Sequence, residues 1–123
     1  MDKRHRILVV DDDADMCELL SDVLEAEGLS VLTVVDSSEA AKILKQEEFD
    51  VIITDLNMPN LDGIQLITAV RKLPGCSFVP ILMLTTESQV EKKDAGRKAG
   101  ATGWIVKPFN ADQLIAVVQK LVK

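Results

Sequence analysis

The stretch ILVVDDD, residues 7–13, passes directly from four apolar residues to three aspartates. An apolar run without polar alternation is typical of a strand that is covered on both faces, as in a parallel sheet. Similar short runs, most of them without alternation, follow at residues 31–35, 51–53, 81–84 and 104–106. The pattern therefore predicts five strands of a parallel sheet.

Segments with helical periodicity lie between and after these runs. In the first of them, apolar residues recur at the spacing of one helical face, at Met16, Leu19, Leu20, Val23 and Leu24, and Gly28 follows as a C-cap. Residues typical of helix starts precede the others, namely Asp36 or Ser37, DGIQ at 62–65, SQVE at 88–91 and Asn110. A strand followed by a helix, five times over, predicts an α/β fold: a doubly wound five-stranded parallel sheet, (βα)5, between two helical layers.

The composition excludes several classes of partner. The net charge of −6 disfavours duplex nucleic acid and anionic membranes, and one Trp, three Phe and no Tyr offer few rings for stacking on single strands. The longest apolar run, residues 114–118, is far too short to cross a bilayer. Cys17 and Cys76 lack metal-binding or redox spacing, so we expect two reduced thiols. These features predict a cytoplasmic protein with neither nucleic acid nor a membrane as its partner.

Polar residues whose side chains can bind ligands or take part in a reaction follow four of the five apolar runs. Ligands of such sheets bind at the carboxyl ends of the strands, where the chain has Asp11, Asp12, Asp13, Asp55, Asn57, Thr85, Thr86 and Lys107. Two carboxylates about 4 Å apart repel each other by roughly 4 kcal/mol at the dielectric of a protein surface. A converging cluster therefore needs a counter-charge, and Mg²⁺ suits oxygen ligands of this kind. Because a carboxylate can accept a phosphoryl group, we predict a site that holds one, with Lys107 and Thr85 as its contacts.

Each residue also has a simpler interpretation when it is taken singly. Asp13 is expected to cap the following helix, Asp11 and Asp12 are of a type common at surfaces, Thr85 is a good strand former, and Lys107 could be a solvated charge. Their joint occurrence at the ends of several strands on one edge is what favours a site.

Four separated motifs give the chain a resemblance to a known family. VVDD at 9–12, TDLNMP at 54–59 with DG at 62–63, LTTE at 84–87 and VKPF at 106–109 resemble the response-regulator receiver domain, and in particular the single-domain chemotaxis regulators of the CheY family. The resemblance covers the whole chain and implies the CheY-like, flavodoxin-like three-layer fold. Residues 1–123 are therefore expected to form a single receiver domain with no attached output domain.

The resemblance implies a phosphoacceptor and a metal site. Asp55 would be the phosphorylated aspartate. Asp12 would be the principal carboxylate ligand of Mg²⁺, Asp11 would act mainly through a bound water, and Asp55 and the backbone carbonyl of Asn57 would complete the set. Gly63 would permit the tight turn before the third helix.

The resemblance also implies a switch. Thr85 and Lys107 would each contact a phosphoryl oxygen, and the Lys107–Pro108 peptide bond would be cis. Trp104 occupies the family's aromatic switch position, which more often holds Tyr or Phe, so the hydrogen bond of a switch Tyr is not available to it. The fourth helix, expected from Gln89 to Ala99, has few apolar residues and an internal glycine, and such marginal elements can move in a switch.

The partners implied are a histidine kinase, a flagellar motor switch protein and a phosphatase, and the protein is expected to be a monomer. It would be a phosphoacceptor that catalyses only its own phosphorylation and dephosphorylation, rather than an enzyme with a separate substrate. On the last helix, Ile115 and Val122 lie off the main apolar stripe, as partner contacts or as part of a broad buried face.

Three alternatives are open. A Mg²⁺-dependent phosphohydrolase of the haloacid dehalogenase type requires a second aspartate where this chain has Asn57. A flavodoxin-type cofactor binder requires a Ser/Thr/Gly-rich phosphate loop where residues 11–13 are aspartates. A phosphorelay intermediate, or a single-domain regulator outside motility, shares the same site and is not separated from a chemotaxis protein by it.

Overall fold

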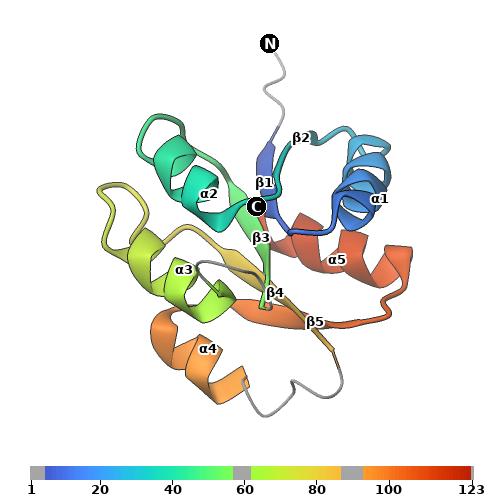
Figure 1. Ribbon diagram of the computed structural model, residues 1–123. Helices are drawn as coiled ribbons and strands as arrows, with labels where there is room; N and C mark the ends of the chain where they lie inside the picture. Colours follow the sequence, from blue (N-terminus) through green and yellow to red (C-terminus); the bar gives the residue numbers. More distant parts are fainter. Residues whose placement is uncertain (1–4, 57–61, 87–92, 123) are drawn as a thin grey trace.

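The computed structural model describes residues 5–56, 62–86 and 93–122 (Figure 1). Within these ranges the chain forms one parallel sheet of five strands in the order β2-β1-β3-β4-β5, as predicted. The strands are β1 (Arg6–Val10), β2 (Ser30–Val34), β3 (Val51–Asp55), β4 (Ile81–Thr86) and β5 (Gly103–Lys107). The order changes direction next to β1, which is where such sheets place their ligand sites.

Helices cover both faces of this sheet (Figure 1). They are α1 (Ala14–Glu25), α2 (Ser37–Leu44), α3 (Gly63–Arg71), α4 (Lys93–Ala99) and α5 (Ala111–Leu121). Helices α1 and α5 pack on one face, and α2, α3 and α4 pack on the other. The predicted doubly wound architecture is therefore confirmed.

The three central strands account for the apolar runs of the sequence. Successive side chains of a strand point to opposite faces, so Ile7 and Val9 join the core under α1 and α5, whereas Leu8 and Val10 join the core under α2 and α3. All residues of β1 except Arg6, and all of β3, are buried. Two cores on one sheet explain why these runs show no alternation.

Two expectations about burial were wrong. Strand β2 is at the edge of the sheet and is not covered on both faces, so Leu32 is 36% exposed. On α1, Leu19 is 48% exposed, and the inward position is taken by Cys17, three residues before the buried Leu20. Leu19 lies two residues beyond Cys17, about 200° around the helix, and therefore faces solvent.

The predicted helix caps set the positions of the loops at the carboxyl edge. The side chain of Asp13 accepts a hydrogen bond from the Asp15 amide at 3.0 Å and caps α1, and Asp36 rather than Ser37 caps α2. Asp62 and Gln65 form both halves of the capping box of α3, and Asn110 caps α5. The capping box expected at residues 88–91 and the expected start of the fourth helix lie outside the described residues.

The interpretation of α5 as a broad buried face is supported for Val122, which packs against the core, while Ile115 is half-buried. No helix in the described ranges is long and apolar enough to cross a membrane.

Candidate functional site

The predicted polar residues meet at the carboxyl edge of the sheet. Register places Asp55 opposite Leu84 and Thr85 opposite Val106, so the ends of β3, β4 and β5 are level with one another. One carboxylate oxygen from each of Asp11, Asp12 and Asp55 lies within 4.8 Å of the others. The convergence that the sequence predicted for these three acids is therefore present in the structure.

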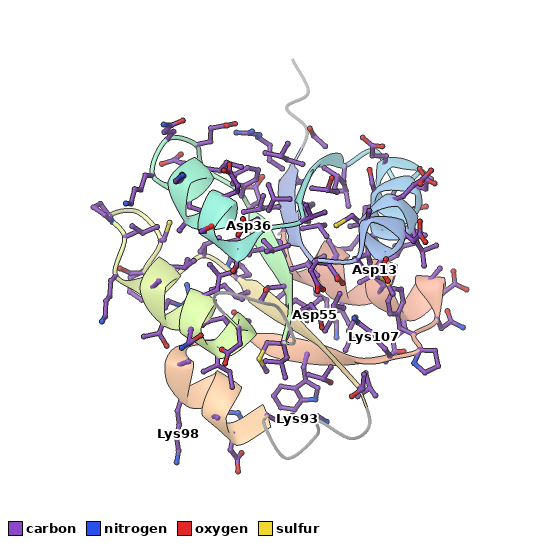
Figure 2. All side chains as sticks on the ribbon, viewed as in Figure 1. Asp13, Asp36, Asp55, Lys93, Lys98 and Lys107 are labelled. Carbon is purple, nitrogen blue, oxygen red and sulfur yellow. The ribbon has the colours of Figure 1, made fainter. Side chains whose placement is uncertain are left out.

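Lys107 brings a positive charge into this cluster from the edge strand (Figure 2). Its Nζ lies 3.2 Å from Asp55 Oδ1 and 3.6 Å from Asp11 Oδ2. Both contacts are ion pairs, and the shorter one joins Lys107 to Asp55. The Lys107 side chain is only 19% exposed, so solvent screens these charges less than at an open surface. A single ammonium offsets a cluster of three carboxylates only in part.

Asp11 is the most constrained of the three acids. Its side chain is 1% exposed, and Oδ1 accepts a hydrogen bond from the Asp13 amide at 3.0 Å. Burial raises the pKa of Asp11 above its ordinary value, and the negative charge of Asp55 raises it further. Among the described residues, neither Asp11 Oδ2 nor Thr85 Oγ1 has a hydrogen-bond partner. Buried polar atoms are almost always paired, so two unpaired oxygens at one site indicate that the site can bind a ligand.

These donors fit Mg²⁺, which the family resemblance implies. Magnesium prefers carboxylate and carbonyl oxygens and keeps several of its waters. Asp11 and Asp55 are buried, and Asp12 is exposed, so the cluster offers oxygens from inside the fold and a side open to water. The orphan Oδ2 of Asp11 is an available oxygen ligand. Asn57, whose carbonyl was expected to join the set, lies outside the described residues.

Close packing of backbone atoms fixes the position of the end of β3 at the site. A Cβ atom at Gly63 would lie 2.4 Å from the carbonyl oxygen of Asp55, and the Gly63 amide donates to the carbonyl of Leu56 at 2.9 Å. The start of α3 therefore rests directly on the end of the Asp55 strand, which only a glycine allows. On the other side, the thiol of Cys17 donates to the carbonyl of Asp11 at 3.3 Å. Sequence reasoning missed this contact, although the spacing of Cys17 from Leu20 and Leu24 pointed to an inward position.

Trp104 is a half-buried residue of β5 whose ring lies against side chains of α4. Lys93 Nζ lies 4.7 Å from the centre of the ring, and the Arg97 guanidinium carbon lies 5.2 Å from it, which are cation–π distances. Sequence reasoning did not identify these cations as partners of the ring, although their i, i+4 spacing places both on one face of α4. The peptide bond between Lys107 and Pro108 is cis.

The internal glycine of α4 has a packing reason. Gly96 is the buried residue of this helix, and a Cβ atom there would lie 2.4 Å from two atoms of the Met83 side chain. Its absence allows α4 to approach β4 closely. The glycine that was expected only to weaken the helix thus also sets its position on the sheet.

Comparisons with known proteins show the family to which this fold belongs. Residues 7–119 match the family model described as the response regulator receiver domain. The transcriptional regulatory protein PrrA of Mycobacterium tuberculosis is 40% identical over 118 residues, which are 96% of this chain and 50% of PrrA. The chain thus spans about half the length of the curated relatives that it matches first.

Solved structures match over almost the whole chain. The chemotaxis response regulator CheY4 of Vibrio cholerae is 42% identical, with a TM-score of 0.91, and the alignment covers 97% of this chain and 99% of CheY4. The receiver domain of the sensor histidine kinase PA1611 from Pseudomonas aeruginosa, described with a magnesium ion coordinated in its active-site cleft, is 25% identical, with a TM-score of 0.89 and 98% of each chain covered. The sheet order, the acidic cluster and these matches agree, and the chain belongs to the family of response-regulator receiver domains.

Proposed function

We propose that this receiver domain accepts a phosphoryl group on Asp55 from a phosphohistidine of a partner histidine kinase, with Mg²⁺ bound at Asp11, Asp12, Asp55 and Asn57. The observation that carries the proposal is the pairing of Lys107 with Asp55 at 3.2 Å beside two orphaned buried oxygens, Asp11 Oδ2 and Thr85 Oγ1. A cluster with these unpaired oxygens is suited to bind a phosphoryl group and Mg²⁺ at the same time.

The chemistry follows from the positions of the side chains. A carboxylate oxygen of Asp55 forms the new P–O bond as the P–N bond of the phosphohistidine breaks, and the bonding electron pair returns to the imidazole nitrogen. The metal, when bound, neutralises charge on the transferring group. Lys107 Nζ is within reach of a phosphoryl oxygen because it already lies beside Asp55 Oδ1. The Thr85 hydroxyl, which lacks a partner among the described residues, can donate a hydrogen bond to another.

The phosphorylated state would be detected through the edge of the sheet. A phosphoryl group adds between one and two negative charges at neutral pH. A shift of Thr85 and Lys107 toward this group would move β4 and β5 relative to α4. The surface formed by α4, β5 and α5, which includes Trp104 of β5, would then bind a target in a phosphorylation-dependent way.

The pathway is proposed to be chemotaxis, with a flagellar motor switch protein as the target. Support comes from the 42% identity to CheY4 over nearly the whole of both chains. The alternative is a regulator outside motility or a phosphorelay intermediate, which the similarity to PrrA keeps open. Binding of the beryllofluoride-activated protein to a purified motor switch protein from the same organism would favour chemotaxis. Absence of such binding would favour the alternative.

Substitution of Asp55 by Asn tests the phosphoacceptor. We expect the variant to fold and to take up no phosphoryl group from acetyl phosphate with Mg²⁺, as measured by intact mass or phosphate-affinity electrophoresis. Asp50→Asn is the matched control, because Asp50 precedes the same strand at its opposite end, beside His5. Equal labelling of Asp55→Asn and the parent protein would contradict the assignment.

A further inference from the structure

Helices α2 and α3 lie side by side on the sheet (Figure 1). Side chains of both helices line a groove of about 560 Å³. Its floor consists of the apolar side chains of Ala41, Ile64, Ala69 and Leu73. All four are half-buried, so the groove presents apolar surface that neither core covers completely. This surface belongs to the helices themselves and is separate from the α4–β5–α5 surface of the proposed function.

The charged residues that line the groove are all positive. Lys45 and Lys72 line it, and none of the other described lining residues is charged. Lys45 and Lys72 are both exposed residues, and neither forms an ion pair within the described part of the chain. In a chain with a net charge of −6, two unpaired cations beside an apolar floor mark a local preference for an anionic partner.

A simpler explanation accounts for the lysines alone. Lys45 and Lys72 are the C-cap residues of α2 and α3, where a cation interacts favourably with the helix dipole. The dipole, however, does not require an apolar floor between the two helices. The combination of the floor with the cations at one end is what distinguishes the groove from two ordinary helix ends.

We propose that this groove docks an acidic amphipathic helix of a partner protein. The apolar ridge of that helix would lie on Ala41, Ile64, Ala69 and Leu73, in the helix-in-groove mode of recognition. Its carboxylates would lie at the end of the groove that carries Lys45 and Lys72. The two helices have eight and nine residues, which correspond to about 12–14 Å, so the complementary segment has about two to three turns.

The groove shares an element with the phosphorylation site. Ile64 follows Gly63, whose backbone rests on Asp55 and Leu56, so α3 has one end at the acidic cluster and one side in the groove. The docking test uses unphosphorylated protein, and its outcome therefore does not depend on the proposed function.

The probe is a fluorescein-labelled designed helix of about 14 residues, roughly four turns, with leucines at helical spacing and glutamates beside them. A second peptide has lysine in place of every glutamate. Binding is measured by fluorescence anisotropy, and the contact surface by amide chemical-shift changes in the ¹⁵N-labelled protein. We expect the acidic peptide to bind at least about tenfold more tightly than the basic one, with the largest shifts on α2 and α3.

The matched variants separate local charge from net charge. Lys45→Glu with Lys72→Glu should weaken the acidic peptide by about tenfold or more, a change of roughly 1.4 kcal/mol. Lys98→Glu with Lys120→Glu makes the same change of charge on exposed positions of α4 and α5 and should alter binding less than about twofold. Circular dichroism confirms that both double variants fold. Equal binding of the two peptides, equal loss in the two double variants, shifts centred outside α2 and α3, or no binding of the acidic peptide would each overturn the proposal.

Discussion

The buried carboxylate of Asp11 destabilises the metal-free fold, although the same carboxylate is suited to bind a metal ion. Its side chain is buried, one oxygen has no hydrogen-bond partner among the described residues, and Asp55 repels it. Lys107 relieves this only in part, because its ammonium lies closer to Asp55 than to Asp11. The folded protein without a metal thus carries an unfavourable interaction that a cation would relieve.

Substitution of Asp11 by Asn should therefore stabilise the metal-free protein. The amide keeps an oxygen for the Asp13 amide and removes the buried charge, so we expect a gain in the free energy of unfolding of about 1 kcal/mol. Mg²⁺ should raise the melting temperature of the parent protein by mass action but not that of the variant. Thermal unfolding followed by circular dichroism, with and without Mg²⁺, measures both effects.

Asp13→Asn is the control for this substitution. It removes the same charge from the same loop, but Asp13 is exposed and Asn is an equally good N-cap. This variant should keep both its stability and its response to Mg²⁺. A clear loss of stability in metal-free Asp11→Asn would mean that Lys107 balances the cluster better than its distances indicate.

Gly63 supports the same site through its missing side chain. Substitution by Ala would place a Cβ atom 2.4 Å from the Asp55 carbonyl oxygen and 2.9 Å from the Leu56 Cα. Both are backbone atoms, so the clash can be relieved only by moving α3 or the end of β3. We expect a loss of about 2 kcal/mol or more in the free energy of unfolding by urea, and slower labelling by acetyl phosphate.

Gly103→Ala is the matched control, because a Cβ atom there would meet only Leu82 Cδ1, at an ordinary 3.7 Å. It should change the free energy of unfolding by less than about 0.5 kcal/mol. If Gly63→Ala were as stable and as quickly labelled as Gly103→Ala, α3 would not be in firm contact with the Asp55 strand.

At the scale of the elements, α4 is held at one end by a side chain from α3. The Arg71 guanidinium donates to the carbonyl of Gly100 through Nε at 3.1 Å and Nη2 at 2.6 Å, and to the carbonyl of Cys76 through Nη1 at 2.9 Å. The Gly100 and Ala101 amides in turn donate to the Gly96 carbonyl. The C-terminal end of α4 is thus tethered to α3 and to the loop that follows α3.

Arg71→Lys should loosen this tether while it keeps the charge. A lysine ammonium cannot reproduce the planar fork, so we expect a loss of about 1.5–3 kcal/mol and faster hydrogen exchange at the Gly100 and Ala101 amides. Arg97→Lys, an exposed replacement on α4, should leave both amides protected. Unchanged exchange in Arg71→Lys would show that the helix end is held by its own backbone hydrogen bonds.

The elements also separate what the sequence predicts from what it does not. Strands β1 and β3 and the caps at Asp13, Asp62 and Asn110 were predictable, because they depend on local patterns. The exposure of Leu19 and Leu32 was not, since it depends on which surface each element turns to its neighbours. For the same reason, the fit of Gly96 against Met83 could not be read from the composition of α4.

Some features of the candidate site were likewise predictable from the sequence, and others were not. Topology alone brings the ends of parallel strands together, so the meeting of Asp11, Asp12 and Asp55 was predictable. The nearer pairing of Lys107 with Asp55 and the orphaned oxygen of Asp11 depend on side-chain rotamers and burial, which no strand pattern specifies.

Across the whole molecule, a continuous path of contacts joins the acidic cluster to α4. On β4, Met83 lies two residues before Thr85. Met83 pairs in register with Trp104 on β5. Met83 also faces Gly96, while Lys93 and Arg97 cover the Trp104 ring. A displacement of Thr85 toward a phosphoryl group would therefore reach α4 both through β4 and through the ring.

Trp104 should report this displacement, since it is the single Trp of the chain and needs no label. Beryllofluoride with Mg²⁺, which stands in for the phosphoryl group on Asp55, should draw the ring inward toward Thr85. Its emission should then shift to the blue, and quenching by acrylamide should slow. Acrylamide is chosen because it is neutral, whereas iodide would be drawn to the cations of Lys93 and Arg97.

Two variants separate the path of the signal from the formation of the complex. Asp55→Asn forms no beryllofluoride adduct and should show no shift. Lys93→Gln with Arg97→Gln keeps the acidic cluster but removes the cations that hold the ring to α4, each worth about 0.5–1 kcal/mol at an exposed site. The ring should then be less restrained before activation, so the emission of the double variant should already be partly shifted to the blue and should change less on addition of beryllofluoride.

If intact mass showed the adduct on the parent protein while emission and quenching stayed constant, Trp104 would be a fixed core residue. Among the contacts of the described residues, coupling to α4 would then run through Met83 and Gly96.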